Sequence, residues 1–196
     1  NWKVSVLLRN LAPRHLQERW FARLLGDPGF LLAHCLTEPR GASDRWLPYN
    51  VPEAAMETRA VLKGEEWVIN GRKLWCTNGT RADLLVVIAK TPAKEFGGRM
   101  RDQFTAFIVD ARTPGYAVGK KEEKLGLHAS STVQLIFEDA RVPATNVLGE
   151  VGQGFKIAMH TLDGGRIGIA AQAVGIAQAC LDASIKYAGE REAFAL

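Results

Sequence analysis

The stretch His34-Cys-Leu-Thr-Glu-Pro-Arg-Gly-Ala-Ser-Asp44 divides the chain into two kinds of sequence. Before it the pattern is typical of helix and loop, and after it the pattern is typical of short strands and tight turns. The stretch continues an apolar run, residues 30–36, and ends in a hydroxyl, a carboxylate, a proline and a small-residue loop. A strand that ends in this way places backbone amides and short hydroxyls at a sheet edge, where a planar polar ligand can dock.

Upstream of this stretch, the sequence predicts one helix over residues 13–25. Pro13 suits a first helical turn, and Leu16 and Trp20 fall on one face at a spacing of about 3.6 residues. Residues 1–10 carry no pattern that assigns them to an element.

Downstream, alternating and apolar runs predict short strands at residues 30–37, 56–63, 67–69, 72–77, 83–90, 104–110, 116–120 and 132–138. Asn70-Gly71 is a strong hairpin signal, so we expect the chain to reverse there. Residues 91–102 are polar and contain glycine, so we expect a loop. Residues 44–52, with two prolines and two aromatic residues, form a second loop and a candidate specificity element. Short strands with regular turns predict an antiparallel β-barrel or sandwich.

From residue 151 the apolar period changes to three or four residues, which predicts a long amphipathic helix with a face rich in alanine and glycine. Gly164-Gly165 inside it indicates a close approach by a ligand or another backbone, or a local break. One helix cannot bury its own apolar face, so we expect it to begin a helical bundle. The predicted fold is α+β in three parts: the end of an N-terminal helical domain (1–29), an antiparallel β domain (30–149), and the first helix of a truncated C-terminal helical domain (150–196).

The composition excludes several classes of protein. The 196 residues carry a net charge of +4 and a pI of about 9.1, with lysine and arginine scattered along the chain. This balance suits a phosphate-bearing ligand but gives no nucleic-acid signature. The three cysteines, Cys35, Cys76 and Cys180, form no Cys-x-x-Cys, which argues against a disulfide framework and a metal site and favours a reducing compartment, the cytoplasm or the mitochondrial matrix. No uninterrupted apolar run approaches the roughly 20 residues of a membrane span.

Five signatures in one order resemble the acyl-CoA dehydrogenases. The first, Thr37-Glu38-Pro39 followed by Ser43-Asp44, resembles the flavin-contacting segment of that family, and the second, Trp75-Cys-Thr-Asn-Gly79, resembles the segment beside the flavin ring. The remaining three lie at residues 124–143, 162–178 and 187–194. Together the matches cover residues 28–196.

The resemblance implies that the cofactor is FAD and assigns residues to it. Thr37 would serve the pyrimidine side of the ring, Thr77 the N5 side, and Trp75 would pack at the ring, with backbone groups of His34 and Leu36 completing the contact. A flavin that accepts a hydride gains negative charge near N1 and O2, so it needs hydrogen-bond donors there and an aromatic wall.

The resemblance also implies contacts made by the last signature. Arg191 would reach the flavin phosphate across a subunit interface, with Phe194 in the same signature. The protein would then be a homo-oligomer, a dimer or a tetramer.

The substrate implied by the resemblance is an acyl-CoA thioester. Asp163 and Arg166, three residues apart on one helix face, would contact the coenzyme A part. Phe155 and Met159 would line the acyl or pantetheine channel, and Ser43 would hydrogen-bond the pantetheine.

The implied reaction is α,β-dehydrogenation of the acyl-CoA, with electrons passed to an electron-transfer flavoprotein. The family's catalytic base is a glutamate that removes the Cα proton, and it is expected beyond Leu196, so no catalytic residue is assigned and the isolated chain is expected to be inactive. Two alternatives stay open: an acyl-CoA oxidase or flavin monooxygenase of the same fold, and a non-catalytic fragment that binds a partner.

Overall fold

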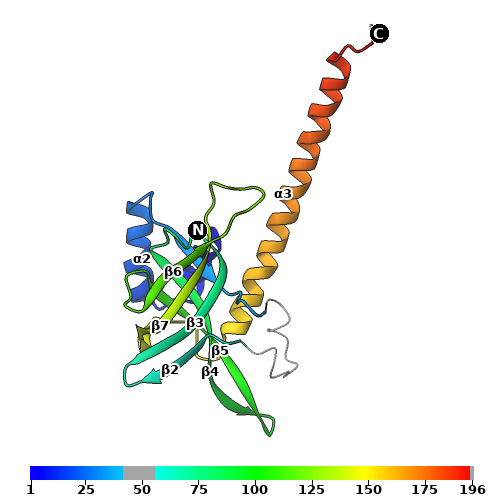
Figure 1. Ribbon diagram of the computed structural model, residues 1–196. Helices are drawn as coiled ribbons and strands as arrows, with labels where there is room; N and C mark the ends of the chain where they lie inside the picture. Colours follow the sequence, from blue (N-terminus) through cyan, green and yellow to red (C-terminus); the bar gives the residue numbers. More distant parts are fainter. Residues whose placement is uncertain (42–55, 195–196) are drawn as a thin grey trace. The chain divides into compact units, whose positions relative to one another are not determined.

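The computed structural model describes residues 1–41 and 56–194 (Figure 1). The candidate specificity loop at residues 44–52 lies outside the described residues. The chain forms two compact units, residues 1–158 and 159–196, and each is described by itself. The predicted domain boundaries after residues 29 and 149 stay predictions.

The first unit is built from two helices and a mixed sheet. Its elements are α1 (Trp2–Leu11), α2 (Arg14–Gly26), β1 (Leu32–Cys35), β2 (Arg59–Lys63), β3 (Glu66–Thr77), β4 (Leu84–Phe96), β5 (Arg99–Asp110), β6 (Tyr116–Lys121), β7 (Thr132–Pro143), η3 (Ala144–Asn146) and β8 (Val147–Leu148). A third helix, α3 (Gly154–Glu190), begins in this unit and continues through the second.

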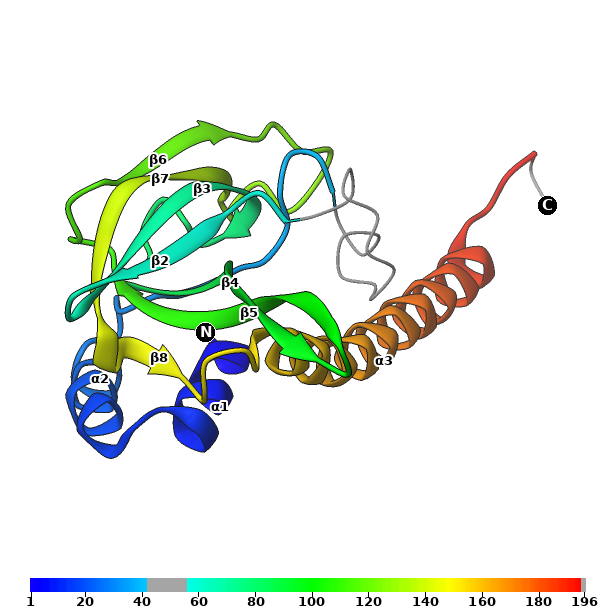
Figure 2. The same cartoon turned by 90° about the horizontal axis from the view of Figure 1, so that it is seen from below.

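The strands follow the order β6-β7-β3-β2-β4-β5-β8, and β1 pairs with β4. Figure 2 shows β6, β7, β3 and β2 on one side of the unit and β4 and β5 on the other, with α1 and α2 beyond β4 and β5. The predicted α+β class is confirmed, and most pairings are antiparallel as expected. The pairings of β1 and β2 with β4 are parallel and were not predicted.

The hairpin predicted at Asn70-Gly71 is wrong. β3 runs unbroken through both residues, and its register against β7 shifts between Ile69 and Gly71. Asn70 exchanges two hydrogen bonds with Asp139 of β7, from its Nδ2 to Asp139 Oδ1 at 3.0 Å and from the Asp139 amide to its Oδ1 at 2.8 Å. Gly71 has a φ of +143°, and a Cβ there would lie 2.6 Å from the Cα of Thr58. The glycine is therefore needed for a bulge and a close backbone approach, not for a chain reversal.

The loop predicted at residues 91–102 is also wrong. β4 and β5 extend through it as a hairpin that turns at Gly97-Gly98, where both residues have positive φ (59° and 74°). This part of the hairpin is polar because it is largely exposed, so it lacks the one-sided apolar alternation by which strands are recognised.

Both N-terminal segments are helical. Residues 1–10, which had no assigned element, contain α1, whose Val4, Leu7 and Leu8 are buried. The helix predicted at residues 13–25 is confirmed as α2, with Pro13 as its N-cap residue.

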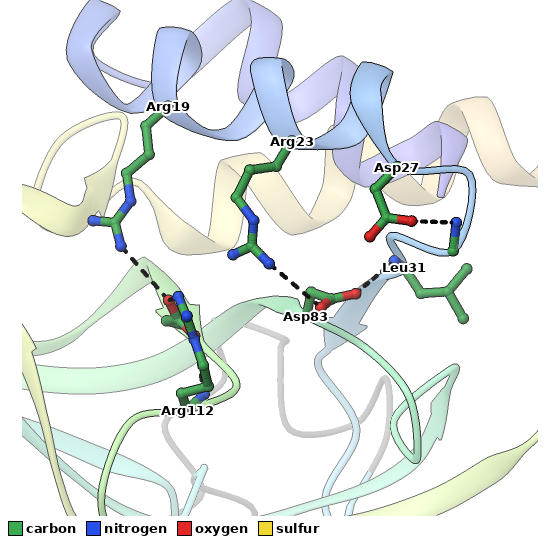
Figure 3. Close-up of polar contacts among 8 residues, drawn as sticks. Arg19, Arg23, Asp27, Leu31, Asp83 and Arg112 are labelled. Carbon is green, nitrogen blue, oxygen red and sulfur yellow. Dashed lines mark hydrogen bonds and ion pairs between the residues drawn. The ribbon is translucent and has the colours of Figure 1, made fainter.

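Helix α2 is held on the sheet partly by charge pairs (Figure 3). Arg23 lies 3.7 Å from the Asp83 carboxylate, and Arg19 lies 3.6 Å from that of Asp110. The other Asp83 oxygen accepts a hydrogen bond from the Leu31 amide at 3.0 Å. Exposed pairs of this kind contribute about 0–1 kcal/mol each, so they orient the helix more than they stabilise it. Asp83 thereby fixes the chain immediately before β1.

The core lies between the two sides of the sheet. Cys35 and Cys76 are both buried in it, which confirms their interpretation as buried small side chains, and the rings of Trp67 and Phe107 pack with centroids 5.2 Å apart. The core cluster consists of Ala33, Cys35, Ala60, Trp67, Ile69, Cys76, Ala82, Leu85, Val87, Ala89, Phe107, Val109, Val133, Leu135, Phe137, Ala140, Val142 and Val147.

The second unit is the greater part of helix α3. The helix is continuous through Gly164-Gly165, so the local break is excluded and the alternative of a close approach stays a prediction. Large apolar side chains are exposed along it: Ile167, Ile169, Val174, Ile176, Leu181 and Ile185.

By length and composition alone, α3 is apolar enough to cross a membrane, with a mean hydropathy of 1.3 over its most apolar window. The helix contains no uninterrupted run of large apolar residues, because glycine, alanine and glutamine are interspersed among them. The inner helix of a soluble bundle has the same composition.

Candidate functional site

The first two signatures lie side by side along β1 and the last part of β3, a region here called the β1–β3 edge. The Leu74 amide donates a hydrogen bond to the Thr37 carbonyl at 2.9 Å. The Asn78 side-chain amide donates to the Leu32 carbonyl at 3.1 Å. Segments about 40 residues apart in sequence are thus joined directly.

The third signature reaches the same place. Ser131, in the segment between β6 and β7, accepts a hydrogen bond on its carbonyl from the Asn78 amide at 3.1 Å. Its hydroxyl lies 2.7 Å from that of Thr80. Three signatures, each recognised separately in the sequence, therefore meet at the last part of β3 and the residues that follow it.

Trp75 is exposed at this edge by a second irregularity of β3. The register against β7 shifts between Lys73 and Cys76, and Trp75 has a φ of 56°. Its side chain is 58% exposed although Cys76 beside it is buried. Bulges re-aim side chains near functional sites, and a bulky residue at positive φ is strained. The strand is thus distorted where an indole ring faces outward.

Two threonines belong to the same two signatures as the Trp75 indole. Thr77 is exposed and ends β3, and Thr37 is half-buried and follows β1. Among the hydrogen bonds of the described residues, none involves either hydroxyl. Both are therefore available to a ligand at the edge.

The half-buried His34 is in a neutral state. Burial is the largest cause, and the charges of Lys3 and Lys73 add to it, so that together they lower the pKa of its imidazole to about 4. The Nε2 atom is buried with no hydrogen-bond partner in the described part of the chain. In β1 the side chain alternates with that of Cys35, so it lies on the face opposite the core cluster. Its predicted role concerned backbone groups only and stays a prediction, as does that of Leu36.

A buried ion pair, not predicted from the sequence, lies beside Thr37. The Lys73 side chain is fully buried, and its ammonium donates to Glu38 Oε1 at 2.9 Å and to the Leu36 carbonyl at 3.1 Å. The Glu38 carboxylate also accepts the Glu57 amide at 2.6 Å and the Thr58 amide at 3.0 Å. This Lys73–Glu38 pair connects the segment after β1, the segment before β2, and β3.

The pair keeps its carboxylate ionised. Burial by itself raises the pKa of Glu38, but the charge of Lys73 and the hydrogen bonds from Thr58, Lys73 and Glu57 outweigh it, so the pKa lies below its ordinary value. Burial lowers the pKa of Lys73, and the charge of Glu38 opposes this shift.

One signal in the sequence pointed to this pair. Counting alternately from buried Ile69 places Gly71 and then Lys73 on the inward face of β3. A lysine at an inward strand position requires a counter-charge, and Glu38 is an acidic residue in the neighbouring signature.

The predicted substrate residues are only partly placed. Phe155 is half-buried in the first turn of α3, within the first unit, and Ser43 lies outside the described residues. Met159 belongs to the second unit, as do Asp163 and Arg166, which form an ion pair at 2.9 Å with both side chains about 70% exposed.

The last predicted cofactor residues also belong to the second unit. Arg191 follows α3, with its amide bonded to the Tyr187 carbonyl at 2.8 Å, and Phe194 is 97% exposed. The structure thus bonds Thr37 to Leu74, which precedes Trp75 in β3, and places Thr77 at the end of the same strand.

The β1–β3 edge has the features of a site for a planar, polar aromatic group. An outward indole supplies a wall, and the hydroxyls of Thr37 and Thr77, which have no hydrogen-bond partner among residues 1–41 and 56–194, supply donors. These are the features that an isoalloxazine ring requires, so the residues present fit a flavin.

Comparison with known proteins places the chain in a family. Residues 33–140 match the family model of the acyl-CoA dehydrogenase middle domain, and residues 152–195 match that of the acyl-CoA dehydrogenase C-terminal domain. The chain belongs to the acyl-CoA dehydrogenase family, as the resemblance predicted.

Individual relatives agree with this assignment. The chain is 52% identical to the mitochondrial short-chain specific acyl-CoA dehydrogenase of Rattus norvegicus. The alignment of 159 residues covers 81% of this chain and 36% of the relative. It is 45% identical over 181 residues to the acryloyl-CoA reductase (NADH) of Anaerotignum propionicum, covering 91% and 43% respectively. The solved structure of butyryl-CoA dehydrogenase from Megasphaera elsdenii matches with a TM-score of 0.82 and 39% identity, over 98% of this chain and 47% of that one. The chain therefore spans less than half the length of these relatives.

Proposed function

We propose that the protein containing this chain is an FAD-dependent acyl-CoA dehydrogenase that introduces a double bond between Cα and Cβ of an acyl-CoA thioester. The observation that carries the proposal is the convergence of three family signatures on the β1–β3 edge, with an exposed indole and two unengaged hydroxyls. The short-chain specific and butyryl-CoA relatives make a short acyl chain the first substrate to test.

The residues of the edge have distinct tasks in this proposal. The Trp75 indole forms the wall behind the flavin ring, and the hydroxyls of Thr37 and Thr77 donate to its polar edge. Bound FAD supplies a two-electron acceptor for hydride. Donors that are already positioned stabilise developing negative charge without reorganising, which is the main electrostatic contribution a protein makes to such a step.

The substrate tasks fall to α3 and the loop before it. Asp163 and Arg166 are proposed to hold the coenzyme A part, Phe155 and Met159 to line the channel, and Ser43 to bind the pantetheine. The base that takes the Cα proton is proposed to be a glutamate in sequence beyond residue 196.

Assembly and electron transfer are part of the same proposal. Arg191 and Phe194 are proposed to contact the flavin of a second subunit, which requires a homo-oligomer. An electron-transfer flavoprotein is the proposed electron acceptor, in the cytoplasm or the mitochondrial matrix.

The test uses the purified full-length protein. Anaerobic addition of butyryl-CoA is expected to bleach the oxidised flavin band, and the Thr37→Val variant is expected to bind FAD at least tenfold more weakly. The Arg141→Met variant, which removes an exposed pair with Glu66, serves as the control and should bind FAD as the unaltered protein does. A protein with no flavin band and no measurable affinity for FAD would overturn the proposal.

A second candidate is the reverse reaction, reduction of an α,β-unsaturated acyl-CoA. It is favoured by the similarity to an acryloyl-CoA reductase (NADH), which covers 91% of the chain. NADH consumption that depends on acryloyl-CoA would support the reductase, and reduction of an electron-transfer flavoprotein by butyryl-CoA would support the dehydrogenase. Oxygen consumption in place of either would indicate the oxidase alternative.

A further inference from the structure

Three successive residues after β1 are held by two successive residues of β3. The Lys73 ammonium bonds the Leu36 carbonyl at 3.1 Å and the Glu38 carboxylate at 2.9 Å, and the Leu74 amide bonds the Thr37 carbonyl between them at 2.9 Å. Thr37 is thus fixed through its own carbonyl and through both of its neighbours. The direction of its hydroxyl follows from the backbone held in this way.

Glu38, the partner of Lys73, is also held in place by several hydrogen bonds. Glu38 closes a short turn by exchanging backbone hydrogen bonds with Gly41, at 3.2 and 3.3 Å. Its carboxylate receives the amides of Glu57 and Thr58, so it cannot follow a movement of Lys73 without losing them. The three contacts of the ammonium, to Leu36, Glu38 and the Met56 sulfur at 3.6 Å, use the three donors that a lysine has.

Stability alone does not account for a charged pair here. Replacing a buried ion pair with apolar side chains of similar volume is often neutral or stabilising, because desolvation of two charges offsets their attraction. An apolar side chain at position 73 would fill the space but could not bond the Leu36 carbonyl. Unlike an apolar residue, the lysine bonds Leu36 and Glu38 and so fixes the backbone on both sides of Thr37.

We propose that Lys73, paired with Glu38, is a positioning residue that aims the Thr37 hydroxyl at the flavin ring. The inference rests on the proposed function in one respect, that Thr37 contacts the flavin. Lys73 itself is buried and acts only through Leu36, Thr37 and Glu38.

The deciding variant is the double substitution Lys73→Met with Glu38→Gln, measured in the full-length flavoprotein after removal and return of FAD. It leaves no unpaired buried charge, but a glutamine at position 38 has one acceptor oxygen where the carboxylate has two, so its melting temperature is expected to fall, though less than that of Glu38→Leu. Its dissociation constant for FAD is expected to rise at least tenfold, and the shape of the visible flavin band is expected to change. Adding Thr37→Val to the double variant should change affinity less than twofold further, because the same contact is already lost.

The outcomes separate this inference from the proposed function. If Thr37→Val alone leaves the affinity and the flavin band unchanged, the Thr37 contact fails and the positioning role fails with it. If Thr37→Val weakens binding but the double variant binds FAD with unaltered affinity and spectrum, only the positioning role is overturned, and the pair is structural. Removal of the exposed Arg141–Glu66 pair, as Arg141→Met with Glu66→Gln, is the matched control and should leave both readouts within twofold.

A second variant, Lys73→Gln with Glu38→Gln, covers a failure to fold, because it too leaves no buried charge without its partner. The glutamine at position 73 keeps an amide donor but is one atom shorter than lysine, so it can bond one of the two acceptors. It is expected to raise the dissociation constant for FAD to an intermediate value. Binding and a spectrum equal to those of the unaltered protein would overturn the proposal.

Discussion

The β1–β3 edge and helix α3 differ in how far their side chains are buried and hydrogen-bonded within the chain. At the edge, a fully buried lysine has every donor engaged, and the segments around it are tied by hydrogen bonds from three parts of the chain. Along α3, apolar side chains such as Ile176 are more than half exposed. The first region carries the contacts that define its geometry, whereas the second has an apolar face that the described residues leave exposed.

The largest expected loss of stability follows from removing one partner of the Lys73–Glu38 pair. Glu38→Leu leaves the Lys73 ammonium buried without its counter-charge and the amides of Glu57 and Thr58 without their acceptor, which should cost about 3–5 kcal/mol of stability. Urea unfolding of the 196-residue chain measures it. Arg141→Met, in an exposed pair, should change stability by less than about 0.5 kcal/mol. Equal losses for the two variants would show that the pair is not effectively buried.

The next effect compares apolar truncations in the two regions. Leu135→Ala in β7 removes a completely buried core side chain and should cost about 2–5 kcal/mol. Ile176→Ala in α3 removes an exposed one and should cost less than about 0.5 kcal/mol in the 196-residue chain. In the full-length protein the Ile176→Ala cost should rise toward that of Leu135→Ala. An unchanged small cost there would mean that the face of α3 stays uncovered.

A smaller effect concerns pH. The pKa of His34 falls from 6.5 to about 4 on folding, so between these values the unfolded chain binds a proton that the folded chain does not. Stability therefore falls as the pH drops through this window, by up to about 3 kcal/mol. The Glu38 carboxylate adds a loss at lower pH, because its stabilisation is present above its ordinary pKa and disappears as the pH falls through the lowered one.

The His34→Phe variant isolates the histidine contribution. Urea unfolding at a series of pH values between 4 and 6.5 should show a flatter dependence in this variant than in the unaltered chain. The same slope in both would place the proton uptake on another group.

The smallest effect on stability is expected in the exposed ion pair of α3. Asp163→Asn should change the stability of the 196-residue chain by only a few tenths of a kcal/mol, because both partners are about 70% exposed. In the full-length protein the same variant should raise the KM for acyl-CoA severalfold while thermal stability stays constant. An unchanged KM would remove Asp163 from the proposed coenzyme A contacts.

The contrast between the regions also explains what could be predicted from sequence. Helix α2 and the core positions of the strands follow from periodicity, because their side chains face one apolar interior. The chain reversal predicted at Asn70-Gly71 is wrong because a hairpin turn and a β-bulge favour the same residues. Only the pairing of β3 with β7 distinguishes the two. The part of the β4–β5 hairpin at residues 91–102 is mostly polar in sequence and so leaves no apolar period to read.

The site was predicted by resemblance and not by pattern. Residue types at Thr37, Trp75 and Thr77 alone are ordinary for strands, and their common position depends on a parallel β1–β4 pairing that no local signal indicates. Lys73 was overlooked because a lysine in a strand is usually exposed, and its burial depends on Glu38, 35 residues away in sequence. The sequence therefore identifies the segments that form the site, but it does not show which charged residues pair across long sequence separations.

The most direct test of the β1–β3 edge as the flavin site is the affinity of the full-length protein for FAD after Trp75→Ala, compared with Trp2→Ala. Both indoles are more than half exposed, at 58% and 66%, but only Trp75 lies at the edge. The account predicts that Trp75→Ala raises the dissociation constant at least tenfold and alters the visible flavin band, while Trp2→Ala leaves both within twofold. Unchanged affinity and spectrum for Trp75→Ala would contradict it.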